Sequence, residues 1–333
     1  KNARDHHALL WINPHTSFFF RSEAKVESDE GLNVYGASTW GQFFIYQGFD
    51  NHAGWMHTST GADVVDEFAE TIVKKDGKLF YRYGTALKPV TSSKITLRYK
   101  TGDGFTTRSF TTYRTGHGPI IRDQNGKWIA ISLMYKPVEA LEQSYLRTKA
   151  KDFKSFKAIA TRLKANSSNN TIFADDRGEI AYMHPHFIPK RNDRFDYTKP
   201  VDGSDPSTDW QGLHALDEAP HLLNPQVGWL YNTNNWPYSA AGPDSPKAAD
   251  YPRYMDDAGE NPRGRHALRV LSNVHDFTKQ SLVKAAFDPY QPAFARLIPP
   301  LLAAYEAQPT DAPLKLKLAE PVAALRGWDF KWS

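Results

Sequence analysis

Apolar and polar side chains alternate along much of the first 150 residues, a pattern typical of strands with one buried face. Residues 94–100, Lys-Ile-Thr-Leu-Arg-Tyr-Lys, show the alternation most clearly. Glycine-containing turn sequences at 75–77, 101–104 and 123–126 each predict a tight connection between two strands. With an apolar run at residues 8–12, which predicts a first strand, these signals indicate that this part of the chain is mainly sheet.

Helical periodicity becomes clear at residues 152–165, where apolar side chains recur every three or four positions and Asp152 can cap the first turn. The other predicted elements are short strands at 171–174 and 179–183 and helices at 263–271, 278–287 and 293–308. Sheet followed by sheet and helices favours a layered α+β fold over alternating β-α-β units.

The composition permits a large core and excludes several function classes. The 333 residues are 40% hydrophobic and 13% aromatic, which argues against disorder. The net charge of +4 comes without any block of like charge, which argues against a nucleic-acid partner. Without cysteine, neither a disulfide framework nor a thiol nucleophile is possible. The longest apolar run, 297–304, contains two prolines, so we expect no membrane span.

Residues 54–66, Gly-Trp-Met-His-Thr-Ser-Thr-Gly-Ala-Asp-Val-Val-Asp, hold the most informative chemistry. Small side chains around Ser59 allow a ligand to approach the main chain, where free N–H groups stabilise an oxyanion. Asp63 and Asp66, with the Val65 carbonyl between them, form a plausible clip for a hard cation. A polar turn followed by a helix start, with Asp63 as N-cap, explains the same residues, and both interpretations stay open.

Three further segments are candidates for the same site. Tyr-Asn-Thr-Asn-Asn-Trp-Pro at 231–237 carries three asparagines that need hydrogen-bond partners, although an asparagine-rich turn is the alternative. His15 follows Asn-Pro at a predicted strand end, where it is either structural or able to bond a catalytic amine. Arg263 and Arg265 open a predicted helix, where ordinary solvated charges are the alternative.

Two histidine motifs favour structural roles. His184-Pro185-His186 suggests a metal pair, but no third ligand follows at a recognisable spacing. A metal-dependent hydrolase built on these two rings is therefore a distant alternative. Gly116-His117-Gly118 predicts a tight approach of the backbone around a structural histidine.

Taken in order along the chain, these segments resemble those of the penicillin acylase family of N-terminal-nucleophile amide hydrolases. The resemblance implies an α+β fold, specifically a four-layer αββα sandwich with antiparallel sheets. It implies that the Ser59 backbone N–H and the Asn234 side-chain amide form the oxyanion hole. It also implies that His15 and Arg263 orient the nucleophile and the substrate.

The resemblance also implies a structural calcium ion, which would rigidify the site without entering the chemistry. Its ligands would be Asp63, the Val65 carbonyl and Asp66. Alignment is less clean farther along the chain, where the Pro200 carbonyl and Asp256 complete the expected set. Relatives active on lactones often lack these carboxylates, so their presence favours the penicillin acylase side.

In this family the nucleophile is a serine that autocatalytic cleavage of a zymogen exposes as a new N-terminus, and its α-amine acts as general base. By the spacing of His15 and Ser59, that serine is expected roughly eight residues before Lys1. We therefore expect residues 1–333 to be part of a β-subunit that continues past Ser333, with a helical segment at about 263–310. An α-subunit from the same precursor would be the partner, in the periplasm or secreted.

The function predicted on this basis is hydrolysis of a linear amide in an N-acyl substrate such as a penicillin-type β-lactam. An acylase acting on acyl-homoserine lactones or lipopeptides is the alternative within the same chemistry. An inactive homologue that binds acyl ligands is the alternative from another class, and it requires that no serine nucleophile be present.

Overall fold

The computed structural model describes residues 2–332 and is built around one seven-stranded antiparallel sheet. The strands of this main sheet are, in spatial order, β1 (Arg21–Ser28), β2 (Leu32–Thr39), β3 (Gln47–Asp50), β4 (Ala53–Ser59), β13 (Asn169–Asp175), β14 (Ile180–Met183) and β16 (His221–Leu223). Strands β4 and β13 lie side by side at its centre, with Ser59 opposite Asn169. The pairing of early with late strands brings the predicted site segments together.

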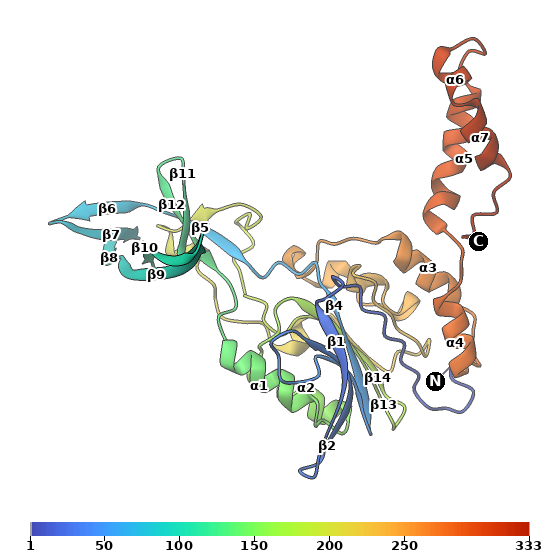
Figure 1. Cartoon of the computed structure of the whole chain (residues 1–333), viewed down its shortest axis with the longest axis horizontal. Helices are drawn as coiled ribbons and strands as arrows, with labels where there is room; N and C mark the ends of the chain where they lie inside the picture. Colours follow the sequence, from blue (N-terminus) through green and yellow to red (C-terminus); the bar gives the residue numbers. More distant parts are fainter. Residues whose placement is uncertain (1, 333) are drawn as a thin grey trace.

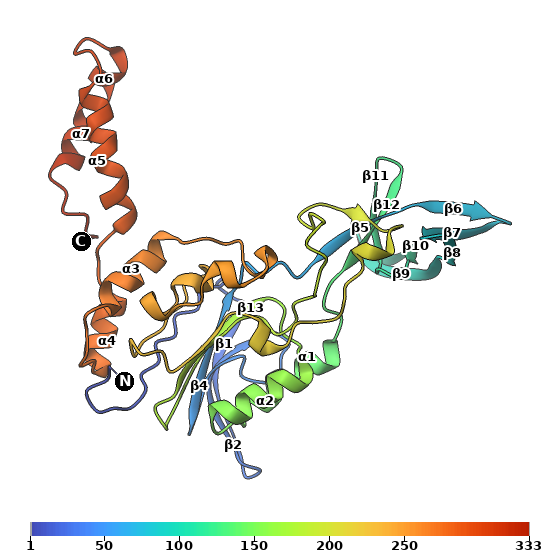
Figure 2. The ribbon, with the colours of Figure 1, turned by 180° about the vertical axis from the view of Figure 1, so that it is seen from behind.

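Helices α1 (Pro137–Arg147) and α2 (Phe153–Leu163) lie along the main sheet in both views of the molecule (Figure 1, Figure 2). The periodic helix predicted at 152–165 is confirmed as α2, and Asp152 caps it by accepting a hydrogen bond from the Ser155 N–H at 2.8 Å. Phe156 packs on Phe173 of β13 in a fully apolar core. Burying these large rings stabilises the layer, at roughly 2–3 kcal/mol for each.

A second lobe of smaller sheets lies beside the main sheet (Figure 1). Its strands are β5 (Asp66–Glu70), β6 (Ile72–Lys75), β7 (Lys78–Tyr83), β8 (Ala86–Pro89), β9 (Thr91–Thr101), β10 (Gly104–Arg114), β11 (Ile120–Gln124), β12 (Lys127–Ser132) and β15 (Val201–Asp202). The three predicted turns are confirmed, because each connects two strands of an antiparallel hairpin. Strand β15 runs parallel to β5, and this pairing ties the segment around 200 to the segment around 66.

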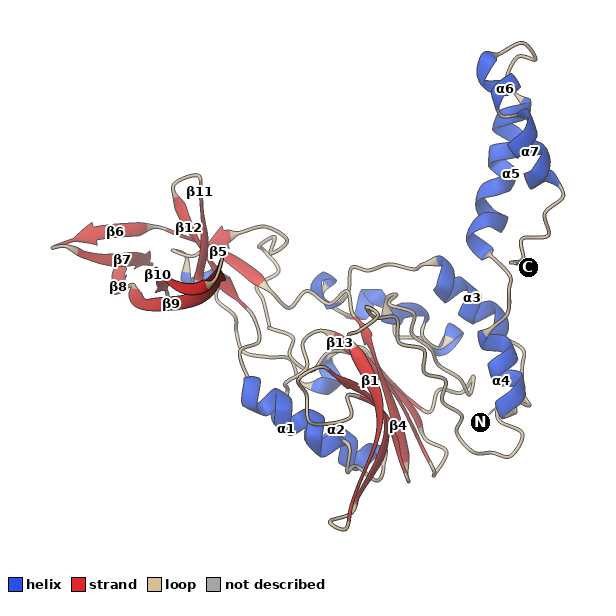
Figure 3. Ribbon diagram, in the orientation of Figure 1, coloured by secondary structure: helices blue, strands red, loops and turns tan. Residues whose placement is uncertain are grey.

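The C-terminal part is helical, as Figure 3 shows. It contains α3 (Pro262–Leu271), α4 (Lys279–Ala286), α5 (Pro292–Glu306), α6 (Pro313–Lys317) and α7 (Ala319–Arg326), of which α3, α4 and α5 match the predicted helices closely. Within residues 2–332 no helix is both long and apolar enough to cross a membrane. Helices α5 to α7 project away from the main sheet.

The stretch between Asp205 and Asp256, predicted in large part as loop, contains only 3-10 turns and the edge strand β16. These turns are η1 (Pro206–Thr208), η2 (Leu216–Glu218), η3 (Pro237–Ser239), η4 (Gly242–Asp244), η5 (Ala248–Asp250) and η6 (Arg253–Met255).

The prediction of a strand at residues 8–12 is wrong, because these residues pair with no strand in the described part of the chain. Leu10 and Ile12 instead pack against Met56, Ile172 and Tyr182 on the face of the main sheet opposite the helices. The apolar run therefore indicated burial. These residues are partly buried because their side chains pack on the sheet, and not because their backbone pairs with another strand.

Two glycines allow β2 and β3 to approach unusually closely. Gly36 lies directly opposite Gly48. A Cβ added to Gly36 would lie 2.3 Å from the Gln47 carbonyl oxygen, and one added to Gly48 would lie 2.1 Å from the Tyr35 carbonyl oxygen. Both obstacles are backbone atoms, so neither position has room for a side chain.

Candidate active site

A single cavity of about 1040 Å³ is lined by all four residues predicted to act in catalysis, His15, Ser59, Asn234 and Arg263. Its walls come from the segment before β1, from the end of β4, from the 228–234 segment and from α3 and α4. Apolar side chains such as Trp11, Met56 and Ile172 supply the rest of the lining. Concave apolar cavities with a few convergent polar groups are the usual form of small-molecule sites.

The Asn234 amide lies against the main chain of Ser59. Asn234 Nδ2 donates to the Ser59 carbonyl oxygen at 3.4 Å, and Asn170 Nδ2 donates to the same oxygen at 3.3 Å. Arg263 Nη2 donates to Asn234 Oδ1 at 3.0 Å, which fixes the amide with its N–H groups toward Ser59. The guanidinium also polarises the amide, and this makes Nδ2 a stronger donor.

The backbone of Asn234 has a φ of 61°, in the left-handed region that asparagine tolerates better than most residues. Asn232 holds this turn by accepting hydrogen bonds from the Asn234 N–H at 3.0 Å and from Thr58 Oγ1 at 2.5 Å. Asn232 therefore has the structural role expected of an asparagine-rich turn, whereas the exposed Asn234 side chain reaches the cavity.

Asn235 is buried and fully partnered, so it also supports the turn. Its Nδ2 lies 3.2 Å from Glu260 Oε1 and 3.0 Å from Ser239 Oγ, and its Oδ1 accepts from the Thr233 N–H. Asn261, the N-cap of α3, donates to the Thr233 carbonyl at 3.0 Å. The turn and the start of α3 are thus one hydrogen-bonded unit, and Asn234 and Arg263 keep a fixed relation. Glu260 was not among the site residues predicted from the sequence.

His15 lies in an irregular segment at the cavity wall. This position leaves its ring available to a group inside the cavity, and its role toward the nucleophile stays a prediction.

The residues predicted to hold calcium lie near one another but have other partners. Asp66 is fully buried, and its carboxylate accepts from Arg191 Nε at 2.7 Å, from Arg191 Nη2 at 3.1 Å and from Trp210 Nε1. Asp63 Oδ1 lies 3.5 Å from the same guanidinium. The sequence did not point to Arg191, which neutralises much of the acidic charge at this position.

Asp256 is likewise engaged by the chain itself. Its carboxylate accepts from the Gly61 N–H at 3.2 Å and from the Ala258 N–H at 2.9 Å, so it holds the turn after Ser59. Its neighbour Asp257, rather than Asp256, lines a hollow of about 560 Å³ together with Asp63 and Val65.

This hollow also contains Lys199, which precedes Pro200. Burial, opposed by Arg191 and reinforced by Asp66, raises the pKa of Asp63 to about 6. Across residues 2–332 no three histidine or acidic side chains are grouped so as to hold a metal ion. Calcium therefore stays a prediction, with oxygen donors but without a complete set of acidic ligands.

His184 and His186 are both buried and have separate partners. His184 Nε2 lies 2.6 Å from the Met255 carbonyl oxygen, and His186 Nδ1 lies 3.0 Å from Gln143 Nε2. Burial lowers the pKa of His184 to about 4 and that of His186 to about 3, so both rings are neutral near pH 7. The structure gives no support to a zinc site built on this pair.

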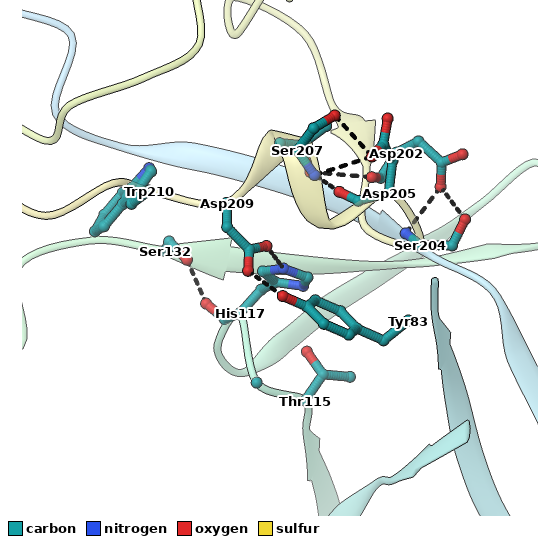
Figure 4. A network of polar contacts seen from close by, with 12 residues as sticks. Tyr83, Thr115, His117, Ser132, Asp202, Ser204, Asp205, Ser207, Asp209 and Trp210 are labelled. Atoms are coloured by element: carbon teal, nitrogen blue, oxygen red, sulfur yellow. Dashed lines mark hydrogen bonds and ion pairs between the residues drawn. The ribbon is translucent and has the colours of Figure 1, made fainter. Parts of the chain in front are cut away.

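His117 is the centre of a polar network in the second lobe (Figure 4). Its Nδ1 lies 2.8 Å from Glu70 Oε1 and its Nε2 lies 2.9 Å from Asp209 Oδ1. Tyr83 donates to the other oxygen of Asp209, and the imidazole stacks on Phe68 at 4.1 Å. Burial lowers the pKa of His117, but the bonds to the two carboxylates outweigh it and the pKa lies above its ordinary value.

Comparison with known proteins adds to this geometry. The family model described as "Penicillin amidase" matches residues 1–333. Penicillin G acylase of Escherichia coli is 30% identical over 218 residues, which cover 62% of this chain and 25% of the relative. Acyl-homoserine lactone acylase PvdQ of Pseudomonas fluorescens (strain Pf-5) is 25% identical over 356 residues, which cover 96% of this chain and 44% of the relative.

Among solved structures, the thermostable penicillin G acylase from Alcaligenes faecalis matches with a TM-score of 0.71. The match covers 96% of this chain and 55% of that chain at 23% identity, and it confirms the predicted fold. The chain spans less than half the length of the two curated relatives. The match of the family model over the full sequence shows that this chain belongs to the penicillin amidase family.

Proposed function

We propose that this chain carries the oxyanion-binding part of an amidohydrolase that cleaves a linear amide in an N-acyl substrate. The observation that carries the proposal is the Asn234 amide, which Arg263 fixes beside the Ser59 main chain at the wall of a large, mainly apolar cavity. The names of the relatives, penicillin G acylase and acyl-homoserine lactone acylase, agree with this chemistry.

The proposed reaction uses an N-terminal serine of the processed enzyme. Its hydroxyl attacks the amide carbon while its α-amine takes the proton, and the carbonyl oxygen becomes an oxyanion. The Ser59 N–H and Asn234 Nδ2 would donate to that oxygen as negative charge develops. The amine then leaves with a proton, and water hydrolyses the acyl-enzyme to release the carboxylic acid.

The test is the kinetics of the full processed enzyme with Asn234→Ala. We expect kcat to fall by roughly 10²–10³-fold with little change in KM, because the donor acts mainly in the transition state. Asn33→Ala is the matched control, since Asn33 is a partly exposed asparagine of β2 whose amide donates to Asn51 Oδ1 in the turn after β3. Unchanged kcat in Asn234→Ala would overturn the assignment.

The substrate class has two candidates, penicillin-type amides and acyl-homoserine lactones. The second is supported by the relative PvdQ, whose match covers 96% of this chain, whereas the match to the Escherichia coli acylase covers 62%. The first is supported by Asp63 and Asp66, the acidic residues that favoured the penicillin acylases in the sequence. Parallel assays with penicillin G and with an N-acyl-homoserine lactone decide between them by kcat/KM.

We also propose that the active enzyme holds a second chain cut from the same precursor and works in the periplasm or outside the cell. N-terminal sequencing and intact mass of the purified mature protein test the processing. A serine as the new N-terminus ahead of Lys1 and a co-purifying second chain are expected. An intact precursor with hydrolytic activity would contradict the mechanism.

Calcium is proposed as a structural ion bound in the hollow by the Asp63 carboxylate and the Val65 carbonyl, with the carbonyl of Pro200, which follows Lys199 in the chain, as a further predicted ligand. Support comes from the hard oxygen donors and from the raised pKa of Asp63, since a cation would relieve the cost of its buried charge. The ion would hold the connection between β4 and β5 rigid.

Thermal unfolding with and without a chelator tests the calcium proposal. We expect chelation to lower Tm by about 3 °C, a loss of roughly 2 kcal/mol, and added calcium to restore it. Asp63→Asn should abolish the response, whereas Asp29→Asn, at an exposed turn residue, should keep it. An identical Tm with and without chelator would remove calcium from the proposal.

A further inference from the structure

Two arginines on different elements converge on the ring of Tyr46. Arg21 begins β1 and Arg147 ends α1, and the guanidinium carbon of each lies 5.0 Å from the centroid of the Tyr46 ring. Arg147 Nη2 also donates to the Tyr46 carbonyl oxygen at 2.8 Å. Arg147 is 5% exposed, so its charge is almost completely removed from water.

These cations have no anionic partner in the described part of the chain. No carboxylate oxygen of residues 2–332 lies within 4.0 Å of either guanidinium. The nearby titratable groups are two buried histidines, His57 and His186. The pKa of His57 lies well below its ordinary value because of burial and then Arg147, and that of His186 falls to about 3 for the same reasons. The cluster therefore combines permanent positive charge with neutral rings.

Several donors of this cluster are buried without a hydrogen-bond partner. They are Arg21 Nε, Arg147 Nε, His57 Nε2 and His186 Nε2. Buried polar groups are normally satisfied, and a buried charge without a counter-ion is costly. His57 Nδ1 faces Thr171 Oγ1 at 3.1 Å, and when that hydroxyl donates, His57 Nε2 carries a hydrogen that is free to donate. The arrangement suits an acceptor that comes from outside the chain.

The cluster opens into the cavity that contains Ser59 and Asn234. Arg21 and His57 line that cavity, whereas Arg147 lies outside its wall. His57 precedes Ser59 by two residues on β4, so their side chains lie on the same face about 7 Å apart along the strand. Tyr46 donates its hydroxyl to Asn169 Oδ1, and Asn169 pairs with Ser59.

We propose that the substrate carries a carboxylate and that Arg21 binds it at this end of the cavity, with His57 as a second donor and Arg147 adding positive potential. Guanidinium forks match carboxylates in a bidentate geometry, and desolvated sites strengthen the pairing. This inference rests on the proposed amide hydrolysis and narrows its substrate class. The carboxylate belongs to the acyl half or to the amine half of the substrate, and the chemistry of recognition is the same for both.

Two matched substrate pairs test the proposal on the full processed enzyme. In the first pair the acyl half differs, adipoyl- against hexanoyl-p-nitroanilide, and in the second the amine half differs, hexanoyl-4-aminobenzoate against hexanoylanilide. We expect kcat/KM to favour the carboxylate by about 10-fold or more in one pair, which identifies the half that carries it.

The variant Arg21→Gln should reduce that preference to about 1-fold, because the charge-assisted bond is lost. Arg162→Gln is the matched control, because Arg162 on α2 forms an exposed ion pair with Glu142 on α1. This variant should keep the preference for the carboxylate substrate. A preference for the neutral substrate in both pairs overturns the proposal. So does an Arg21→Gln enzyme that loses activity equally on all four substrates.

If none of the four amides is hydrolysed, the proposed function fails. The anion site is then tested separately, by whether a carboxylate ligand binds to it. Thermal unfolding is measured with adipate and with its neutral diamide. A rise in Tm with adipate only, present in the wild type and absent in Arg21→Gln, supports the site. The same Tm with both compounds overturns it.

Discussion

Two clusters of side chains in this molecule differ in whether their positively charged groups have carboxylate partners. In the second lobe, His117 lies between the carboxylates of Glu70 and Asp209, and its ring stacks on Phe68. Beside the cavity, Arg21 and Arg147 lie against Tyr46 with no carboxylate among the described residues to pair with them. In the first cluster both ring nitrogens have carboxylate partners, although Glu70 Oε2 has no hydrogen-bond partner among the described residues. In the second cluster the two guanidinium groups have no carboxylate partner at all within residues 2–332.

The difference distinguishes a structural joint from a binding site. The His117 cluster connects Glu70 of β5, Tyr83 at the end of β7 and Asp209 directly after η1, so its polar contacts tie these parts of the second lobe together (Figure 4). The Arg21 cluster opens into the cavity and leaves donors unused. A buried charge that is satisfied contributes to the fold, and one that is unsatisfied is available to a ligand.

The largest expected effect comes from removing the ring of the satisfied cluster. His117→Ala leaves the fully buried Glu70 with only the Thr115 hydroxyl as a partner and without its positive neighbour, and we expect a loss of about 3–5 kcal/mol in the free energy of unfolding. Denaturant unfolding near neutral pH measures it. His52→Ala, at an exposed pair with Asp176, is the control and should cost less than about 1 kcal/mol. Equal costs for the two variants would contradict the comparison.

The same histidine gives this cluster a pH dependence of known sign. Because the pKa of His117 is raised in the folded state, its stabilisation is complete below the ordinary value near 6.5. It is lost as the pH rises through the folded pKa. The difference in stability between wild type and His117→Ala should therefore shrink on the alkaline side.

Acid should act through the second cluster in the opposite direction. The pKa of His186 is lowered to about 3, so its stabilisation is complete above pH 6.5 and decreases as the pH falls toward 3. We expect His186 to contribute about 2 kcal/mol of the loss at pH 5. His186→Asn should flatten the acid limb of stability against pH, whereas the more exposed His221→Asn should not. An unchanged slope would show that the pKa of His186 is not lowered in the folded protein.

A smaller effect is expected at the rim of the satisfied cluster. Tyr83→Phe removes the hydroxyl that donates to Asp209, whose side chain is 36% exposed, and should cost about 1–2 kcal/mol. Tyr35→Phe removes a bond to Glu23 that is fully in solvent and should cost little. Thermal unfolding of both variants measures the difference, and a neutral Tyr83→Phe would confine the joint to His117 and Glu70.

The smallest effect is expected where charge is unsatisfied. Arg147→Met keeps the apolar stem and removes a buried charge without a counter-ion, so stability should change by less than about 1 kcal/mol in either direction. Denaturant unfolding in the absence of anionic ligands is the measurement. A loss as large as that of His117→Ala would erase the distinction between the two clusters.

The sequence predicted local structure well where the signal is local. The hairpins follow from glycine turns, and α2 follows from its cap and periodicity. Helix α1 was missed because its most buried residues, Gln143 and Arg147, are polar while Val138 is 70% exposed. Its pattern is the reverse of an ordinary amphipathic helix, so hydrophobic periodicity could not reveal it.

Site residues were found where a motif carried them and missed where only distant pairing places them. Ser59, Asn234 and Arg263 belong to recognisable segments and line one cavity. Arg191 pairs with Asp66 across 125 positions, and no local pattern in the sequence encodes such a contact. The same limit explains why Asp257 was not distinguished from its neighbour at the hollow.

The paired glycines of β2 and β3 have a consequence for how this protein can change over evolutionary time. A side chain at Gly36 or at Gly48 would collide with the backbone of the neighbouring strand. Backbone atoms of a paired strand cannot move away as the end of a flexible side chain can. Gly48 lies two residues after Tyr46, the residue on which the two arginines of the cationic cluster converge. Residues that contact a substrate can therefore be substituted one at a time. A single substitution of either glycine, in contrast, would place a side chain against the backbone of the neighbouring strand. We therefore expect a side chain at either glycine to be accepted only if the backbones of β2 and β3 move apart.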